Sequence, residues 1–274
     1  MTTVDIAAIA AMIEAVAAAE VMPRWRNLAT TDITEKNGPD DLVTVADKAV
    51  EDVLTVRLRA ALPGSDVVGE EAVHADPRLL DRLRQPGLVW VIDPIDGTSS
   101  FARGEPVFSV MVALLRDGEP VAGVLHAPAL GHTTYAARGE GAWRRERGGL
   151  AVRLLRPAPV TGPADMIGIV GKRAFADDRR AGILARAGRF KELRGNSGCA
   201  GIDYPDLARG HIHVALYSKS EPWDHLPGLA IVAEQGFHYA RHDGTPYAPG
   251  DNTGGLLVAS SAGHWQAVRD ALLA

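Results

Sequence analysis

The sequence predicts a mixed α/β protein, because the spacing of its apolar residues changes along the chain. In the first half, two stretches with apolar residues at helical spacing precede several segments with strand character. In the second half, strand-like and helix-like segments alternate, which is typical of α/β units. We therefore expect two subdomains packed as one body, residues 1–155 with a largely antiparallel sheet and residues 156–274 with a mixed α/β arrangement.

The first elements are predicted from the Pro and Gly residues at which the helical spacing of apolar residues ends. A helix is predicted over residues 4–22, where the helical spacing stops before Pro23. The polar stretch 30–41, with Gly38-Pro39 near its centre, predicts a mobile loop. A second helix is predicted over residues 44–62, because Pro-Gly follows it.

The remaining elements are predicted from changes in the spacing of apolar residues along the chain. Strands are predicted in the first half at 66–70, 88–92, 107–116, 121–126 and 133–137. Asp117-Gly118 predicts a hairpin turn between two of them. Strands are predicted in the second half at 166–170, 211–217 and 256–260. Helices are predicted there at 174–187, 198–209, 224–235 and 262–273.

Composition excludes several classes of protein. The 34 acidic and 29 basic residues give a formal charge of −5, without the basic surplus expected of a nucleic-acid binder. No apolar run approaches the length of a membrane span. Asp5 and Glu14 interrupt the Ala-rich start, which argues against a signal peptide. The single cysteine, Cys199, allows no intrachain disulfide and favours a cytoplasmic location.

The segment from Leu88 to Thr98 is the most informative. An apolar run ends in Asp93 and Asp96, three positions apart, followed by Gly97 and Thr98. A proline between the two aspartates fixes the turn, and the glycine lets backbone amides approach a ligand closely. Oxygen ligands beside free amides suit a divalent cation together with a phosphate. The alternative is a solvated Pro/Gly turn, which the full string after a buried strand disfavours.

Three other acidic segments have a similar setting at strand ends and helix starts. They are Gly69–Glu71, Asp41–Asp47 and Trp223–Gly228. Each alone is also explained as a solvated pair or a helix cap. Two carboxylates about 4 Å apart repel by roughly 4 kcal/mol at an effective dielectric near 20, so a shared pocket would need cations. The hard oxygen ligands favour Mg²⁺ over zinc.

These segments resemble the inositol monophosphatase family, which consists of Mg²⁺-dependent, lithium-sensitive phosphomonoesterases. The strings that carry the resemblance are DPIDGT at 93–98, GEE at 69–71, DLVTVAD at 41–47 and WDHLPG at 223–228. The resemblance covers about residues 5–260. It implies a layered αβαβα sandwich of the sugar-phosphatase type, usually a homodimer, with the site between the two halves.

The resemblance also implies metal ligands. Glu70, Asp93 and the Ile95 carbonyl would hold one Mg²⁺. Asp93, Asp96 and Asp224 would hold a second, with Asp93 bridging and Asp96 also bordering the substrate. Glu70 would also face a weaker third ion and act among the catalytic groups.

The resemblance assigns further roles to the water, the phosphate and the entrance. Asp47 and Thr98 would orient the attacking water. The amides of Gly97, Thr98 and Ser99 would hold the phosphate, and Lys36 would lie on the mobile loop near the entrance. An activated water in an in-line displacement needs no Ser, Cys or His nucleophile.

The substrate wall departs from the pattern. Tyr217 stands where the inositol phosphatases place a glutamate that contacts ring hydroxyls. The segment bordering the sugar consists of Gly198, Cys199 and Ala200, and His213 replaces a customary aspartate. The chemistry is therefore expected to be intact, whereas the choice of substrate is open.

Several side chains have two interpretations. Cys199 is interpreted as a small packed side chain, because nothing basic flanks it. His213 lacks the further ligands that a zinc site would need. His225 either supports the metal site or lies on the helix surface. Lys219 is interpreted as solvated; the alternative is that it binds a phosphate or carboxylate of the substrate.

The leading hypothesis is hydrolysis of inositol monophosphate by Mg²⁺-activated water. The alternatives within the superfamily are fructose 1,6-bisphosphate, 3′-phosphoadenosine 5′-phosphate and histidinol phosphate, so the partner is a small polyol, sugar or nucleotide phosphate. An alternative of another class is a phosphate-binding protein without catalysis. A protein of that class would lack one of the family's metal-ligating carboxylates, and none of them is missing from this sequence.

Overall fold

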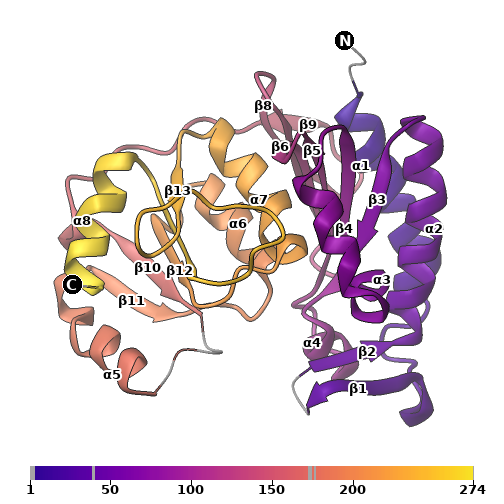
Figure 1. Ribbon diagram of the computed structural model, residues 1–274, viewed down its shortest axis with the longest axis horizontal. Helices are drawn as coiled ribbons and strands as arrows, with labels where there is room; N and C mark the ends of the chain where they lie inside the picture. The colour runs from indigo at the N-terminus through magenta and orange to yellow at the C-terminus, as the bar shows by residue number, and fades with distance from the viewer. Residues whose placement is uncertain (1–3, 39–40, 172–174, 176, 274) are drawn as a thin grey trace.

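The computed structural model describes residues 4–38, 41–171, 175 and 177–273. Its elements form five layers, helices alternating with two sheets, as Figure 1 shows from right to left. The expected αβαβα sandwich is thus confirmed. The helices are α1 Ile6–Val16, α2 Val45–Ala61, α3 Glu70–Ala75, α4 Thr98–Ala102, α5 Asp177–Ala185, α6 Ala200–Ala208, α7 Pro222–Glu234 and α8 Ala262–Leu272. Within the described part of the chain, none of them is long and apolar enough to cross a membrane.

The first sheet has seven strands in chain order. They are β3 Asp66–Gly69, β4 Leu88–Asp96, β5 Ser109–Arg116, β6 Glu119–Ala127, β7 His132–Ala137, β8 Gly141–Glu146 and β9 Ala151–Arg153. β3 pairs with β4 in parallel, and all later neighbours are antiparallel. Asp117 and Gly118 both have positive φ between β5 and β6, so the predicted hairpin turn is confirmed.

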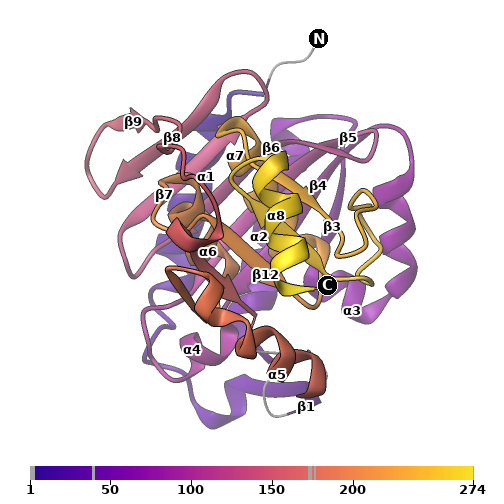
Figure 2. The ribbon, with the colours of Figure 1, turned by 90° about the vertical axis from the view of Figure 1, so that its left-hand side faces the viewer.

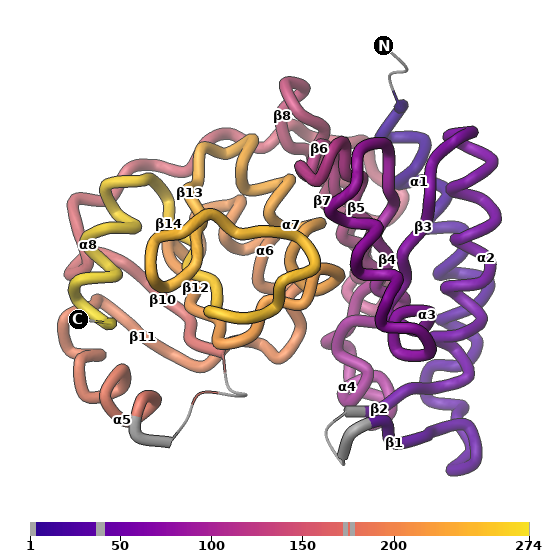
Figure 3. The backbone as a smooth tube through the Cα atoms, viewed as in Figure 1, coloured from indigo at the N-terminus to yellow at the C-terminus, as the bar shows by residue number. Residues whose placement is uncertain are grey.

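The second sheet has five strands in the order β11-β10-β12-β14-β13. They are β10 Ile167–Val170, β11 Glu192–Gly195, β12 Val214–Tyr217, β13 His238–Ala240 and β14 Leu256–Ala259. The chain passes from the first sheet to the second between β9 and β10 (Figure 3). In the view of Figure 2, α8 and α5 lie in front of this sheet as its outer layer.

The polar stretch at 30–41 is not the loop that we expected. β1 (Ile33–Gly38) pairs with β2 (Asp41–Thr44) as an antiparallel hairpin, with a register shift between Glu35 and Gly38. This ladder depends on backbone hydrogen bonds and has no apolar alternation, so the hydrophobic pattern could not reveal it. α3, α4, β8, β9, β11 and β13 were also not predicted.

The middle layer brings the two halves of the chain together. α7 lies across β4 to β7 of the first sheet and also packs beside α6. Leu226 of α7 is fully buried in one cluster with Val89 and Val91 of β4. The start of α7 is thereby held close to the carboxyl end of β4.

Candidate active site

The carboxyl end of β4 forms the centre of the candidate site. The β4–β5 pairing shifts register between Asp93 and Asp96, so the ladder is interrupted where the two aspartates lie. Gly97 follows with φ of 85°, a conformation that favours glycine, and α4 starts at Thr98. The Ser100 and Phe101 amides donate to the Gly97 carbonyl at 2.8 and 3.0 Å and close this first turn. The start of a helix is a common position for binding an anion.

The acidic residues predicted for the site act electrostatically on one buried carboxyl, that of Asp93. Asp93 is 1% exposed, and burial raises the pKa of its carboxyl well above the ordinary range. The carboxylates of Glu70, Asp96, Asp224 and Asp47 raise that pKa further. Four carboxylates contributed by four segments therefore disfavour a negative charge on Asp93.

The cluster has the chemistry of a cation site. Asp93 Oδ1 is buried, and no described residue donates a hydrogen bond to it. The nearby donor set consists of oxygens, which suits Mg²⁺. As the described residues stand, however, no three acidic, histidine or cysteine side chains are gathered closely enough to hold a metal ion. Two of the carboxylates have protein partners: Lys36 pairs with Glu70, and the Gly201 amide donates to Asp96.

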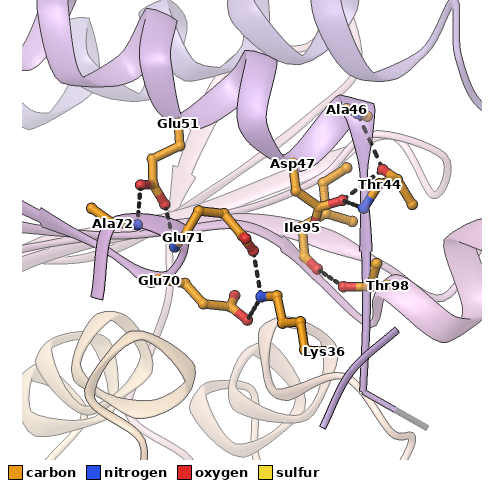
Figure 4. Close-up of polar contacts among 10 residues, drawn as sticks. All are labelled: Lys36, Thr44, Ala46, Asp47, Glu51, Glu70, Glu71, Ala72, Ile95 and Thr98. Atoms are coloured by element: carbon orange, nitrogen blue, oxygen red, sulfur yellow. Dashed lines mark hydrogen bonds and ion pairs between the residues drawn. The ribbon is translucent and has the colours of Figure 1, made fainter. Parts of the chain in front are cut away.

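Lys36 lies deeper than a residue at the entrance, where we expected it. Its side chain is 4% exposed, and its ammonium lies between Glu70 and Glu71 (Figure 4). The distances from Nζ to the two Oε1 atoms are 2.9 and 2.5 Å. Burial lowers the pKa of Lys36, but the two carboxylates outweigh this and raise it above its usual value. Burial in turn raises the pKa of Glu70 to about 8, against the opposing effect of Lys36.

Asp47 and Thr98 are both held by hydrogen bonds at this site (Figure 4). Asp47, 1% exposed, accepts from the amide and the hydroxyl of Thr44 at 2.7 and 2.6 Å. Burial raises the pKa of Asp47 to about 7, although the bonds from Thr44 lower it. The Thr98 hydroxyl donates to the Ile95 carbonyl at 2.8 Å, which leaves its oxygen able to accept from a water.

The start of α6 ties the second half of the chain to β4. The Gly201 amide donates to Asp96 Oδ2 at 2.7 Å. Cys199, at the N-cap of α6, is 1% exposed, with Sγ 3.5 Å from both Ser109 Oγ and the Asp96 carbonyl oxygen. Burial raises the pKa of the Cys199 thiol well above its usual range, so the thiol is unreactive and packed. Gly198 and Ala200 flank Cys199 in the sequence.

Tyr217, which we expected at the substrate wall, is buried and bonded to the protein. It is 6% exposed, and its hydroxyl donates to Asp203 Oδ2 at 3.4 Å. Asp203 also accepts from the Ser197 amide at 3.1 Å and so anchors the segment before α6. Burial raises the pKa of Asp203 to about 6. The Tyr217 ring lies 4.6 Å from the His225 ring, which completes a buried aromatic support.

Comparison with known proteins identifies this arrangement. The family model described as the inositol monophosphatase family matches residues 1–273. The chain belongs to the inositol monophosphatase family. Members of this family are phosphatases, that is, phosphoric monoester hydrolases, and they are generally Mg²⁺-dependent and act on small phosphorylated substrates.

Relatives within the family carry different substrate names. A histidinol-phosphatase of Mycobacterium tuberculosis is 43% identical over 220 residues, covering 78% of this chain and 81% of that protein. An inositol-1-monophosphatase of Mycobacterium leprae is 32% identical over 248 residues, covering 88% and 80%. The solved structure of an IMPase of Thermotoga maritima, 24% identical, shares the fold with a TM-score of 0.78 and coverage of 98% and 96%.

The remaining predicted residues have protein partners. His225 is buried, not on the helix surface, and its two ring nitrogens lie 3.0 Å from the Tyr204 hydroxyl and 3.2 Å from the Lys219 carbonyl. Lys219 itself is exposed. His213 Nδ1 accepts a hydrogen bond from the Ile167 amide at 3.0 Å.

Two residues were missed by sequence reasoning, Glu51 and Asp203. Glu51 lies one helical turn after Asp47, a spacing that places both on one face of α2. Its burial could have been inferred from that spacing. Asp203 carried no comparable signal, because its partner Tyr217 lies in another element.

Proposed function

We propose that the protein is a Mg²⁺-dependent phosphatase that hydrolyses a small phosphate monoester through an activated water. The observation that carries this proposal is the buried Asp93 carboxylate, whose Oδ1 lacks a described partner while four other carboxylates raise its pKa. A non-catalytic phosphate binder would not need so costly a concentration of like charge.

The proposed ligands of Mg²⁺ are the oxygens of Glu70, Asp93, Ile95, Asp96 and Asp224. Two ions fit this number of donors, and a third would lie beside Glu70. The metal would supply a water of lowered pKa and charge compensation for the leaving oxygen. Lys36 contacts Glu70 and the Gly201 amide contacts Asp96, so both contacts would have to break before these oxygens could bind a metal.

The chain's own groups supply the remaining steps. The Thr98 oxygen would accept a hydrogen bond from the attacking water, since its proton is committed to Ile95. Asp47, held by the amide and hydroxyl of Thr44, would orient that water by accepting a hydrogen bond from it. The amides at the start of α4, from Gly97 to Ser99, would hold the phosphate oxygens.

For the substrate, we favour histidinol phosphate over inositol monophosphate. Tyr217 offers a neutral phenol, already bonded to Asp203, where a wall carboxylate would bind ring hydroxyls. The 43% identity to a histidinol-phosphatase exceeds the 32% identity to the inositol-1-monophosphatase described above. A substrate with one phosphate and few other hydroxyls suits this wall better than a polyol.

Phosphate release from a panel of substrates tests this proposal. The panel comprises histidinol phosphate, inositol 1-phosphate, fructose 1,6-bisphosphate and 3′-phosphoadenosine 5′-phosphate, each with Mg²⁺ and with EDTA. We expect Mg²⁺-dependent turnover with kcat/KM highest for histidinol phosphate. A preference for inositol 1-phosphate would overturn the substrate assignment, and no turnover of any member would overturn the enzymatic proposal.

Lithium inhibition and homodimer formation belong to the same proposal. Li⁺ is expected to compete at the site of Asp93, Asp96 and Asp224, and activity that millimolar Li⁺ leaves unchanged would count against that site. A cytoplasmic location is also expected, as the single cysteine suggests.

A further inference from the structure

Glu51 is a buried carboxylate beside the candidate site with no role in the chemistry described above. It lies on α2, four residues after Asp47, and is 7% exposed. Burying a carboxylate is costly unless strong hydrogen bonds compensate for the lost water. The contacts of Glu51 therefore indicate what its carboxylate is for.

Both oxygens of Glu51 bind the first turn of α3. Oε2 accepts from the Glu71 amide and Oε1 from the Ala72 amide, each at 2.8 Å (Figure 4). These are the second and third residues of α3, whose amides have no acceptor within their own helix. Glu51 thus caps α3 from another helix, with two charge-assisted hydrogen bonds.

The residue before α3 is shaped for this contact. A Cβ atom at Gly69 would lie 2.2 Å from Glu51 Cδ, so a larger residue there would displace the carboxyl group. Gly69 has φ of −106°, a conformation open to any residue. The glycine is therefore required by the approach of Glu51 and not by backbone conformation.

We propose that Glu51 is a positioning residue that aims Glu70 into the carboxylate cluster by fixing the start of α3. The proposal rests on the proposed function, in which Glu70 is a metal ligand. Glu70 immediately precedes the two amides that Glu51 holds, so its backbone cannot turn while those amides are bound. α2 thereby supplies both Asp47, which in the proposed function orients the attacking water, and Glu51, which supports Glu70.

The test compares Mg²⁺ binding in four proteins by isothermal titration calorimetry. Glu51→Gln keeps one acceptor oxygen and places an amide group against an N–H donor. Gly69→Ala leaves Glu51 intact but displaces its carboxyl group. Asp52→Asn is the matched control, because Asp52 is the next residue of α2 and is exposed. Mg²⁺ affinity should fall about 10- to 100-fold in the first two variants, as is typical for groups that orient metal ligands, and stay unchanged in the control.

Three further readouts separate positioning from general destabilisation. Raising the Mg²⁺ concentration should restore most of kcat in Glu51→Gln while its melting temperature without metal stays within a few degrees of wild type. In the metal-free wild type, the Glu71 and Ala72 amides should exchange slowly with solvent, and in Glu51→Gln faster. Wild-type Mg²⁺ affinity in both variants would overturn the proposal, as would rapid exchange of the two amides in the wild type.

These outcomes are distinct from a failure of the proposed function. If the wild type binds no Mg²⁺, the metal assignment is wrong, whereas the amide exchange still decides whether Glu51 holds α3. If Glu51→Gln does not fold, the Gly69→Ala variant and wild-type exchange decide the matter.

Discussion

The ammonium of Lys36 lies 2.9 Å from Oε1 of Glu70, a residue that the family resemblance assigns to a metal. A cation of the protein thus occupies the neighbourhood of a proposed metal ligand. The same ammonium contacts Glu71, so Lys36 offsets two partly buried carboxylates at once. Metal binding and Lys36 binding at Glu70 are expected to compete.

Lys36→Gln should destabilise the metal-free protein and enlarge its response to Mg²⁺. Removing one partner of a buried ion pair typically costs about 3–5 kcal/mol, because the other charge stays buried. Mg²⁺ would then compensate for charge that Lys36 no longer offsets. Thermal unfolding in EDTA and in Mg²⁺ checks this, with Lys48→Gln, an exposed lysine of α2, as control. Equal Mg²⁺-induced shifts in variant and wild type would contradict the competition.

Asp93→Asn should stabilise the metal-free protein at pH 8. Burial and the neighbouring carboxylates raise the pKa of Asp93, so the charged form costs more in the folded state than in the unfolded chain. Stability is then lost as the pH rises from the ordinary aspartate pKa toward the raised one. The asparagine side chain carries no charge and so has no such cost. Each kcal/mol of added stability raises the melting temperature by about 2–4 °C. A lower melting temperature than wild type in EDTA at pH 8 would count against this account.

Changing the wall at Tyr217 should change substrate preference. The double variant Tyr217→Glu with Asp203→Asn restores a wall carboxylate and removes the repulsion that Asp203 would add. We expect the ratio of kcat/KM for inositol 1-phosphate to that for histidinol phosphate to rise about tenfold, which corresponds to roughly 1.4 kcal/mol. Tyr217→Phe, which keeps the ring, is the control and should leave the ratio unchanged. An unchanged ratio in the double variant would show that Tyr217 does not decide specificity.

His126 should make the fold sensitive to acid. Burial lowers the pKa of this histidine from 6.5 to about 4, partly offset by Glu14, and its Nδ1 lies 2.9 Å from the Thr133 hydroxyl. The unfolded chain binds the proton more readily, so the contribution of His126 is complete above pH 6.5 and lost as the pH falls toward 4.

The expected loss over that window is on the order of 3 kcal/mol. Urea unfolding at pH 7 and pH 4.5 measures it as the difference between wild type and His126→Asn. The variant should lose less stability on acidification than the wild type. His238→Asn, at an exposed position, is the control. The same acid loss in His126→Asn and wild type would rule out this role.

The centre of the site was predictable because its signals are local. The buried run before Asp93 and the Pro and Gly after it define a strand end without reference to other elements. Such patterns depend only on the period and on turn chemistry. Asp47 was identified only through the family resemblance; the structure places it in the first turn of α2, after the Thr44 cap.

The contacts between distant elements were not predictable. Lys36 is 34 residues from Glu70 in sequence, and no local pattern indicates that its ammonium turns inward. Similarly, nothing in the sequence pairs Tyr217 with Asp203. Glu51 falls between these cases, because its spacing from Asp47 predicts burial but not its partners at α3.

Mg²⁺ titration and phosphate release, measured together on wild type and Asp93→Asn, test the central claim most directly. Asp93 is the residue on which the other carboxylates converge, so one substitution should remove both properties. We expect the wild type to bind Mg²⁺ and to release phosphate only when Mg²⁺ is present, and the variant to lose both. Wild-type turnover in EDTA, or turnover by the variant close to that of the wild type, would contradict a metal-dependent phosphatase built on Asp93.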